Sequence, residues 1–314
     1  MCRGALIYFS NLEDFFSAVK PHLIQKNPPE LTEQNFEMVF NYENLEVLRK
    51  VGIFMFGEPR EFLELLQFRD FITRIEFIIY RIQNNDEVVF DEYFDKEWCA
   101  NPENAVFTEV KEFFKLIKNP ILRSFVEASY YEYAPNRNFL YFNVGLERKF
   151  LAYLFEYVKS FDKENHDVFF RIIGEFLEIE IIIWSLRMHL KYGMKYEEII
   201  LLIPHFNIFL KDEEFNNLIS VGSVLEAYEL LEKSYYSKFF KDPVFPEQSL
   251  SNLFMEFDYK LKREMYGYFN DNPFCYGPIL SYYILKRFEV VKLISICEGI
   301  KLDYDKEKLK ELVQ

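Results

Sequence analysis

Hydrophobic and polar positions over residues 169–236 predict a long helix followed by two short acidic helices. Gly193 is placed to end the long helix, because glycine readily takes the left-handed conformation found at helix C-termini. Asp212 opens the next helix, and Ser223 and Glu226 have the spacing of a capping box at the start of the last one. Six apolar residues at helical spacing would form one stripe along the long helix: Ile172, Phe176, Ile179, Ile183, Leu186 and Leu190.

The same order of a long helix, a stop and a short helix recurs twice more. One further copy begins at Pro59, which a first helical turn tolerates, and ends near Asn84. The other begins at Pro278 and stops at Gly299, ahead of a short charged terminal helix. The copies share periodicity more than residue identity, so this repeat alone is weak support for a duplication.

Three copies of one helical unit predict an all-α protein of three similar helical domains, over residues 1–128, 129–240 and 241–314. Composition agrees with this fold class. The 314 residues include only 10 Gly and 12 Pro, fewer than the many turns of a β-sandwich need. The 36 Phe and 22 Tyr supply ample material for packed interiors.

Charge and hydropathy exclude several classes of partner. The net charge of −14 argues against nucleic acid and against anionic lipid head groups, which both need a Lys/Arg surplus, and most of these charges would be solvated helix faces. No apolar run approaches the roughly 18 to 20 residues that span a bilayer, and the N-terminal run is too short for a signal peptide. The four cysteines lie far apart, which is typical of reduced thiols in a cytosolic protein: Cys2, Cys99, Cys275 and Cys297.

The sequence contains none of the familiar motifs of catalytic sites. There is no glycine-rich phosphate-binding loop and no nucleophile elbow. The four histidines are dispersed without metal-ligand spacing: His22, His166, His189 and His205. Glu175, Glu178 and Glu180 are candidate carboxylates, but Glu178 and Glu180 point in different directions on a helix. We therefore predict no catalytic, cofactor-binding or metal-binding residues, and expect these glutamates to border the apolar stripe and pair with another helix.

The order of features in the last two units resembles the C (also called d) subunit family of vacuolar and archaeal-type rotary ATPases. In that family a helix carries an acidic residue, an Asn three positions later and a closing Arg. The segment EIEIIIWSLRMHLKYGM is similar to this helix, with Glu178 at the acidic place, Ile181 at the Asn place and Arg187 at the closing place. The last helix is similar to the family's last helix at four places: Pro278, Tyr282, Glu289 and Lys292.

The resemblance implies a non-catalytic rotor part, needing no cofactor and present in one copy per complex. Its three domains would form a funnel around a central hollow, on the cytoplasmic face of the membrane-embedded proteolipid ring. The end of the central axle would sit in the funnel, so that rotation passes between ring and axle in ATP-linked proton or sodium transport. The subunit would be cytoplasmic and peripheral, reaching the membrane only through protein.

Four residues become structural or interface candidates through the resemblance: Glu178, Arg187, Glu289 and Lys292. We expect a carboxylate partner for Arg187, and expect Glu178 and Glu289, at matching places of two units, to support packing between helices. Two other classes of function stay open. One is a generic α-helical repeat adaptor for protein–protein interaction, unrelated to rotary ATPases. The other is an enzyme of a new kind.

Overall fold

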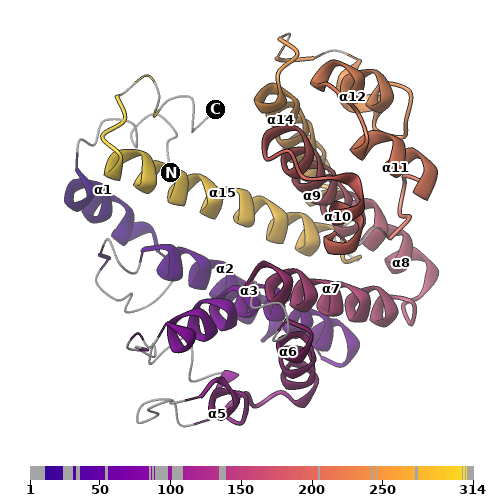
Figure 1. The fold of residues 1–314 in the computed structure, drawn as a ribbon. Coiled ribbons are helices and arrows are strands. Elements are labelled where there is room, and N and C mark those ends of the chain that lie inside the picture. Colours follow the sequence, from indigo (N-terminus) through magenta and orange to yellow (C-terminus); the bar gives the residue numbers. More distant parts are fainter. Residues whose placement is uncertain are drawn as a thin grey trace. The chain divides into compact units, whose positions relative to one another are not determined.

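The computed structural model is built of α-helices (Figure 1). It describes residues 11–23, 31–32, 36–53, 56–84, 86, 88, 98–100, 109–133, 139–203, 206–241, 243–245, 247–272, 275–305, 307 and 309. These contain no β-strand, only one isolated bridge between Cys99 and Ile117, so the all-α prediction is confirmed. Within the described residues, no helix combines the length and the apolarity needed to cross a bilayer.

The helices follow one another along the chain as α1 (Leu12–Val19), η2 (Lys20–His22), α2 (Phe36–Gly52), α3 (Glu58–Gln83), α5 (Val110–Phe114), α6 (Pro120–Tyr133), α7 (Phe139–Val158), α8 (Lys163–Phe169), η4 (Phe170–Gly174), α9 (Glu175–Leu186), η5 (Arg187–Lys191), α10 (Tyr196–Leu202), α11 (Asp212–Ile219), α12 (Val224–Leu231), α13 (Ser237–Phe240), α14 (Leu250–Phe269) and α15 (Gly277–Lys301).

The chain divides into two compact units. The first unit combines Met1–Tyr131 with Lys286–Gln314, and the second is Glu132–Leu285. The N-terminal part of the long helix α15 therefore belongs to the second unit and its C-terminal part to the first. The predicted three domains, and the funnel that they would form, stay predictions.

The core of the first unit joins the two ends of the chain. Phe16 and Phe36 bring α1 and α2 together, with ring centroids 6.1 Å apart, and α15 contributes the buried residues Val290, Ile296 and Cys297 to the same cluster. Helices α2 and α3 pack closely along one another. The C-terminal part of α15 is thus held by residues far away in sequence.

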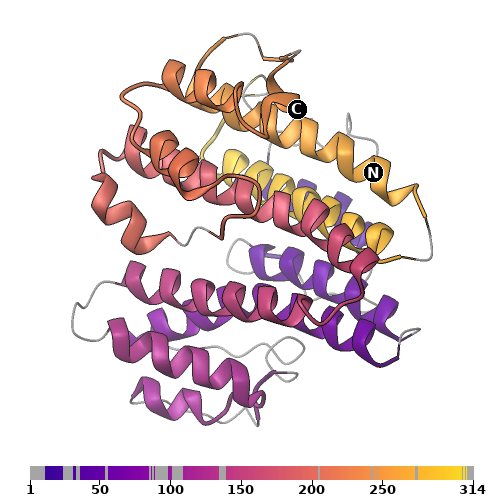
Figure 2. The same cartoon turned by 90° about the vertical axis from the view of Figure 1, so that its right-hand side faces the viewer.

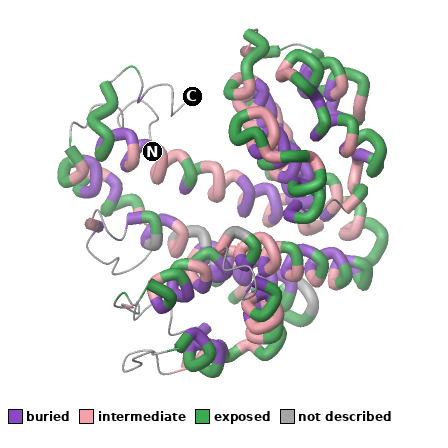
Figure 3. Tube along the Cα trace, in the orientation of Figure 1, coloured by how far each residue is buried: buried purple, intermediate pink, exposed green. Residues whose placement is uncertain are grey.

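Helix α9 is the centre of the second unit. Nine of its twelve residues are buried, and it packs against α11 and α14 (Figures 2 and 3). Five of the six predicted stripe residues lie on this helical stretch up to Leu186, and four of these five are buried: Ile172, Phe176, Ile179 and Leu186. A helix that is apolar on most sides must be surrounded by protein, and α9 meets this condition.

The predicted long helix is not uniformly α-helical. The turns η4 and η5, on either side of α9, are π-helical. A π-turn inserts an extra residue per turn and so rotates the side chains that follow it. This rotation explains why the stripe weakens toward its end, where Leu190 is only partly buried.

The helix ends can be compared one by one with the capping and stop signals predicted from the sequence. Gly193 ends the helix with φ +65°, as predicted. Ser223 Oγ caps α12 by accepting from Glu226 N, but the Glu226 carboxylate accepts from Gly222 N at 2.8 Å, one residue before the position that a capping box requires. The predicted stop at Gly299 is wrong, because α15 continues to Lys301 and turns at Asp303, with φ 54°. Cys2 and His205 lie outside the described residues.

Candidate functional site

Glu178 is a buried carboxylate of α9 that accepts several hydrogen bonds in the second unit. Only 1% of this residue is exposed. Its two carboxylate oxygens accept from three consecutive backbone amides in the connection between α10 and α11, those of Ile208, Phe209 and Leu210, at 3.1 to 3.3 Å. The preceding residue, Asn207, has φ 50°, a left-handed conformation that asparagine tolerates better than most residues. Successive amides after such a turn form a concave anion-binding nest, and Glu178 fills it.

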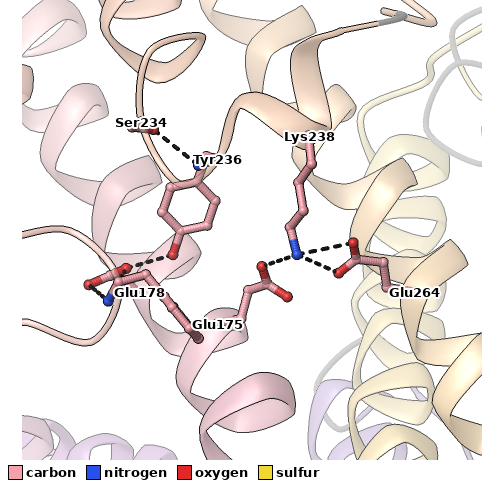
Figure 4. Close-up of polar contacts among 7 residues, drawn as sticks. Glu175, Glu178, Ser234, Tyr236, Lys238 and Glu264 are labelled. Carbon is pink, nitrogen blue, oxygen red and sulfur yellow. Dashed lines mark hydrogen bonds and ion pairs between the residues drawn. The ribbon is translucent and has the colours of Figure 1, made fainter.

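Tyr236 completes the coordination of Glu178. Its hydroxyl donates to Glu178 Oε2 at 2.7 Å (Figure 4). Burial and the neighbouring charge of Glu178 raise the pKa of the Tyr236 hydroxyl well above its usual value, so the hydroxyl keeps the proton that it donates. The carboxylate of Glu178 thus holds a loop and an aromatic residue against α9.

Glu175, one helical turn before Glu178, has a different environment. It is also 1% exposed, but its Oε1 lies beside the ammonium of Lys238, at 2.6 Å. Lys238 Nζ is shared, because Glu264 Oε1 of α14 lies 3.1 Å from it (Figure 4). Glu175 Oε2 has no hydrogen-bond partner among the described residues. One cation therefore serves two carboxylates from two helices.

The electrostatics of this cluster follow from burial. Burial raises the pKa of the Glu175 carboxyl to about 8, although the ammonium of Lys238 opposes the shift. Burial alone would lower the pKa of Lys238, but its contact with Glu175 and the charge of Glu264 outweigh burial and raise that pKa. The ammonium therefore stays charged while Glu175 is the group that can change its protonation state.

Two further polar groups, one buried and one partly buried, hold connecting segments to helices in the second unit. Glu256 of α14 is buried, and its Oε2 accepts from the backbone amides of Val244 and Phe245 at 2.8 and 3.1 Å. The two ring nitrogens of His189 each lie 3.0 Å from a backbone carbonyl oxygen, those of Met194 and Val221. Both residues hold loops to helices rather than facing a cavity.

Arg187 lies between aromatic rings instead of beside a carboxylate. Its guanidinium carbon is 5.5 Å from the ring centroid of Trp184 and 5.2 Å from that of Phe254 on α14. Among the described residues no carboxylate oxygen lies within ion-pair distance of it, so the expected ion pair is not formed there. Half of Trp184 is exposed, at 51%, which places this stack at the edge of the packing between α9 and α14.

Glu289 and Lys292 belong to the part of α15 in the first unit. Glu289 is exposed and pairs with Lys286 one turn earlier on the same helix, while Lys292 is partly buried. Glu178 and Glu289 therefore differ in environment: the first is a buried acceptor and the second a surface ion pair. The structure brings Glu178 and Arg187 into one unit but assigns Glu289 and Lys292 to the other.

The sequence motifs missed the partners of the buried carboxylates. Tyr236, Lys238 and Glu264 lie far from α9 in sequence, and no local spacing connects them to it. A signal was present on α9 itself, since two glutamates one turn apart inside an apolar run must find partners when buried. For catalysis the arrangement offers little: the oxygens of Glu178 are occupied by donors. Nor does any group of three or more His, Cys, Asp or Glu in the described part of the chain form a candidate metal site.

Comparison with known proteins places the chain in a family. The family model described as ATP synthase (C/AC39) subunit matches residues 5–312. No curated protein sequence matches the chain. Because the match covers nearly the whole chain, the chain belongs to the ATP synthase (C/AC39) subunit family, that is, to the C/AC39 subunits of V/A-type rotary ATP synthases.

Proposed function

We propose that this member of the C/AC39 family is the non-catalytic central-stalk rotor subunit of its ATPase, coupling the central axle to the membrane proteolipid ring for ATP-linked proton or sodium transport. The observation that carries the proposal is the family match over residues 5–312. Three similar helical domains forming a funnel, with the axle end seated in it, are part of the proposal. In this view one copy serves each complex, on the cytoplasmic side.

A coupling between rotating parts must resist deformation, and the second unit has features suited to this. Protein interiors packed with Phe, Ile and Leu have low compressibility. Glu178 and Glu256 add directional contacts, because each fixes a connecting segment to a helix through backbone amides. Loops held in this way yield less under load than loops held by apolar contact alone. The same features support a passive mechanical role for these carboxylates.

The surface charge supports a basic protein partner. With a net charge of −14, the chain would meet Lys/Arg-rich surfaces of the axle subunits and gain orientation and association rate more than affinity. Association with purified axle subunits should slow as salt rises from about 50 to 500 mM, since the Debye length then falls well below 10 Å. A rate that is independent of salt would contradict this part of the proposal.

Reconstitution tests the coupling role. Membranes that hold the ATPase without this chain should show ATP hydrolysis by the catalytic sector but no ATP-driven ion transport, and adding the purified chain should restore transport. Normal transport in its complete absence would contradict the proposal. Failure of a tagged chain to co-purify with the membrane-bound ATPase would instead favour the adaptor.

Cross-linking separates a rotor part from a stationary part. A covalent link between this chain and the proteolipid ring should leave ATP-driven rotation intact, because both ends of the link turn together. A link between this chain and the peripheral stator should stop rotation. The reverse pattern would show that the chain belongs to the stator. Photo-reactive residues at exposed positions in each unit, such as Phe77 and Tyr266, provide starting points for the links.

A further inference from the structure

The cluster around Glu175 contains an unbalanced charge in a buried place. Glu175 Oε1 and Glu264 Oε1 lie 2.6 and 3.1 Å from the same ammonium, that of Lys238. The two carboxylates come from α9 and α14, while the ammonium comes from α13. If both acids are ionised, the cluster carries a net charge of −1 beside a residue that is 1% exposed. Glu264 is partly exposed, with 30% of its side chain accessible, so solvent relieves Glu264 but not Glu175.

We propose that the protonation state of Glu175 controls how tightly α13 and α14 pack on α9. The packing is tight while Glu175 holds a proton, and it loosens when the proton leaves. In the protonated state Lys238 neutralises Glu264 alone, and the cluster has no net charge. Loss of the proton places a second negative charge against the same ammonium and leaves Glu175 Oε2 without a donor. The inference does not depend on the proposed rotor role.

The groups that face Glu175 are bound to neighbours or keep their protons in the neutral range. On its own helix Glu178 is occupied by backbone amides and Tyr236. From the segment before α13 comes Tyr235, whose pKa is raised to about 12 by burial and by Glu175. From α14 comes Tyr268, whose pKa is raised by burial and by Glu264. These hydroxyls stay protonated through the neutral range.

The other elements packed on α9 bring further charged and polar groups. The carboxylates of α11 are exposed in its first turn: Asp212, Glu213 and Glu214. The turn η4 brings Arg171, and the turn η5 brings Arg187, His189 and Lys191. A test must therefore isolate Glu175 by substitution.

The direction of the pH effect follows from the raised pKa of Glu175. In the unfolded chain the carboxyl has its ordinary pKa of 4.5, and in the fold the pKa is about 8. Between these values the folded protein holds the proton more tightly than the unfolded chain, so stability falls as pH rises through this window. Above about pH 8 both states are ionised, and the contribution of this group levels off. The loss should therefore be visible between about pH 6 and 8.5.

Thermal unfolding across that pH range tests the proposal. We expect the melting temperature of the wild-type protein to fall more steeply than that of Glu175→Gln, with a difference of about 2 to 5 °C accumulated between about pH 6 and 8.5. Glu229→Gln, an exposed carboxylate on α12, is the matched control and should follow the wild type. After division by the pH-dependent intrinsic exchange rate, hydrogen exchange within residues 237–240 and 250–269 should accelerate over the same range in the wild type and in Glu229→Gln, but not in Glu175→Gln. Equal pH slopes for wild type and Glu175→Gln would overturn the proposal.

A second variant keeps the test decisive if Glu175→Gln does not fold. Glu264→Gln removes the competing carboxylate, so Lys238 serves Glu175 alone and the protonation midpoint of Glu175 should move to lower pH. The midpoint can be read from the infrared band of the protonated carboxyl group, assigned by its dependence on Glu264→Gln. A midpoint that stays unchanged, or a carboxyl that is ionised at about pH 6, would overturn the proposal as well.

Discussion

Glu175 and Glu178 lie one turn apart on α9 and are equally buried, yet their partners differ in kind. Glu178 receives three backbone amides and the Tyr236 hydroxyl, all of which are neutral donors fixed in place. Glu175 receives one ammonium that it shares with Glu264. Burial by itself therefore does not decide what a carboxylate does in this fold. The donors separate the two carboxylates: Glu178 anchors a loop through four neutral donors, whereas Glu175 shares one ammonium, which is the arrangement that the proposed proton-dependent contact requires.

Loss of the Glu178 carboxylate should lower stability most. Glu178→Ala leaves three amides and a hydroxyl buried without an acceptor, which should lower the free energy of unfolding by about 3 to 5 kcal/mol. Denaturant unfolding measures this loss, and hydrogen exchange at Ile208, Phe209 and Leu210 should accelerate. Glu229→Ala on α12 is the matched surface control and should change stability by less than about 0.5 kcal/mol. A loss below about 1 kcal/mol for Glu178→Ala would show that the nest is satisfied by water.

A steric contact with the loop that Glu178 binds should lower stability by a smaller amount. A Cβ at Gly174 would lie 3.1 Å from Ile208 Cγ2, so Gly174→Ala should displace Ile208 and lower the free energy of unfolding by about 1 to 2 kcal/mol. Gly267, in α14, is the matched control because nothing lies within 4 Å of its added Cβ. Gly267→Ala should stabilise the helix by up to about 1 kcal/mol.

The link between Gly174 and Glu178 can be tested by combining the two changes. Both act on Ile208, Gly174→Ala through its side chain and Glu178→Ala through its amide, so the double variant should lose less stability than the two single losses added together. Strict additivity in denaturant unfolding would mean that Gly174→Ala acts through Phe170, whose Cδ1 lies 3.3 Å from the added Cβ, instead of through the loop.

Loss of the Tyr236 hydroxyl should have an effect of similar size. Tyr236→Phe removes the hydroxyl but keeps the ring and the three amides, so Glu178 stays bound and the free energy of unfolding should fall by about 1 to 2 kcal/mol. The loss should be nearly absent when Glu178 is already Ala, because the hydroxyl then has no carboxylate to bind. An unchanged loss in the Glu178→Ala background would assign the effect of Tyr236 to packing with its aromatic neighbours, such as Phe257.

The fold class and several helix ends could be predicted from the sequence because they depend on local spacing. The left-handed Gly193 and the Ser223 cap are of this kind. The π-turns at η4 and η5 could not be predicted, since a pattern of period 3.6 does not register one inserted residue. Nor could the two roles of Glu175 and Glu178, because their partners lie about 30 to 90 residues away along the chain and are brought together only by packing.

The aromatic surroundings of Arg187 change the loss of stability expected when it is replaced. This loss should be the smallest of those predicted here. A buried ion pair at this position would make Arg187→Ala cost about 3 to 5 kcal/mol. The guanidinium instead contacts the rings of Trp184 and Phe254 in a partly exposed site. Such contacts contribute about 0.5 to 1 kcal/mol each at exposed sites, so Arg187→Ala should lower the free energy of unfolding by about 1 kcal/mol. Arg187→Lys keeps the charge but loses the flat stacking surface, and should recover only part of this loss. A cost of several kcal/mol for Arg187→Ala, measured by denaturant unfolding and nearly abolished by Arg187→Lys, would show that charge and not stacking holds this edge of α9.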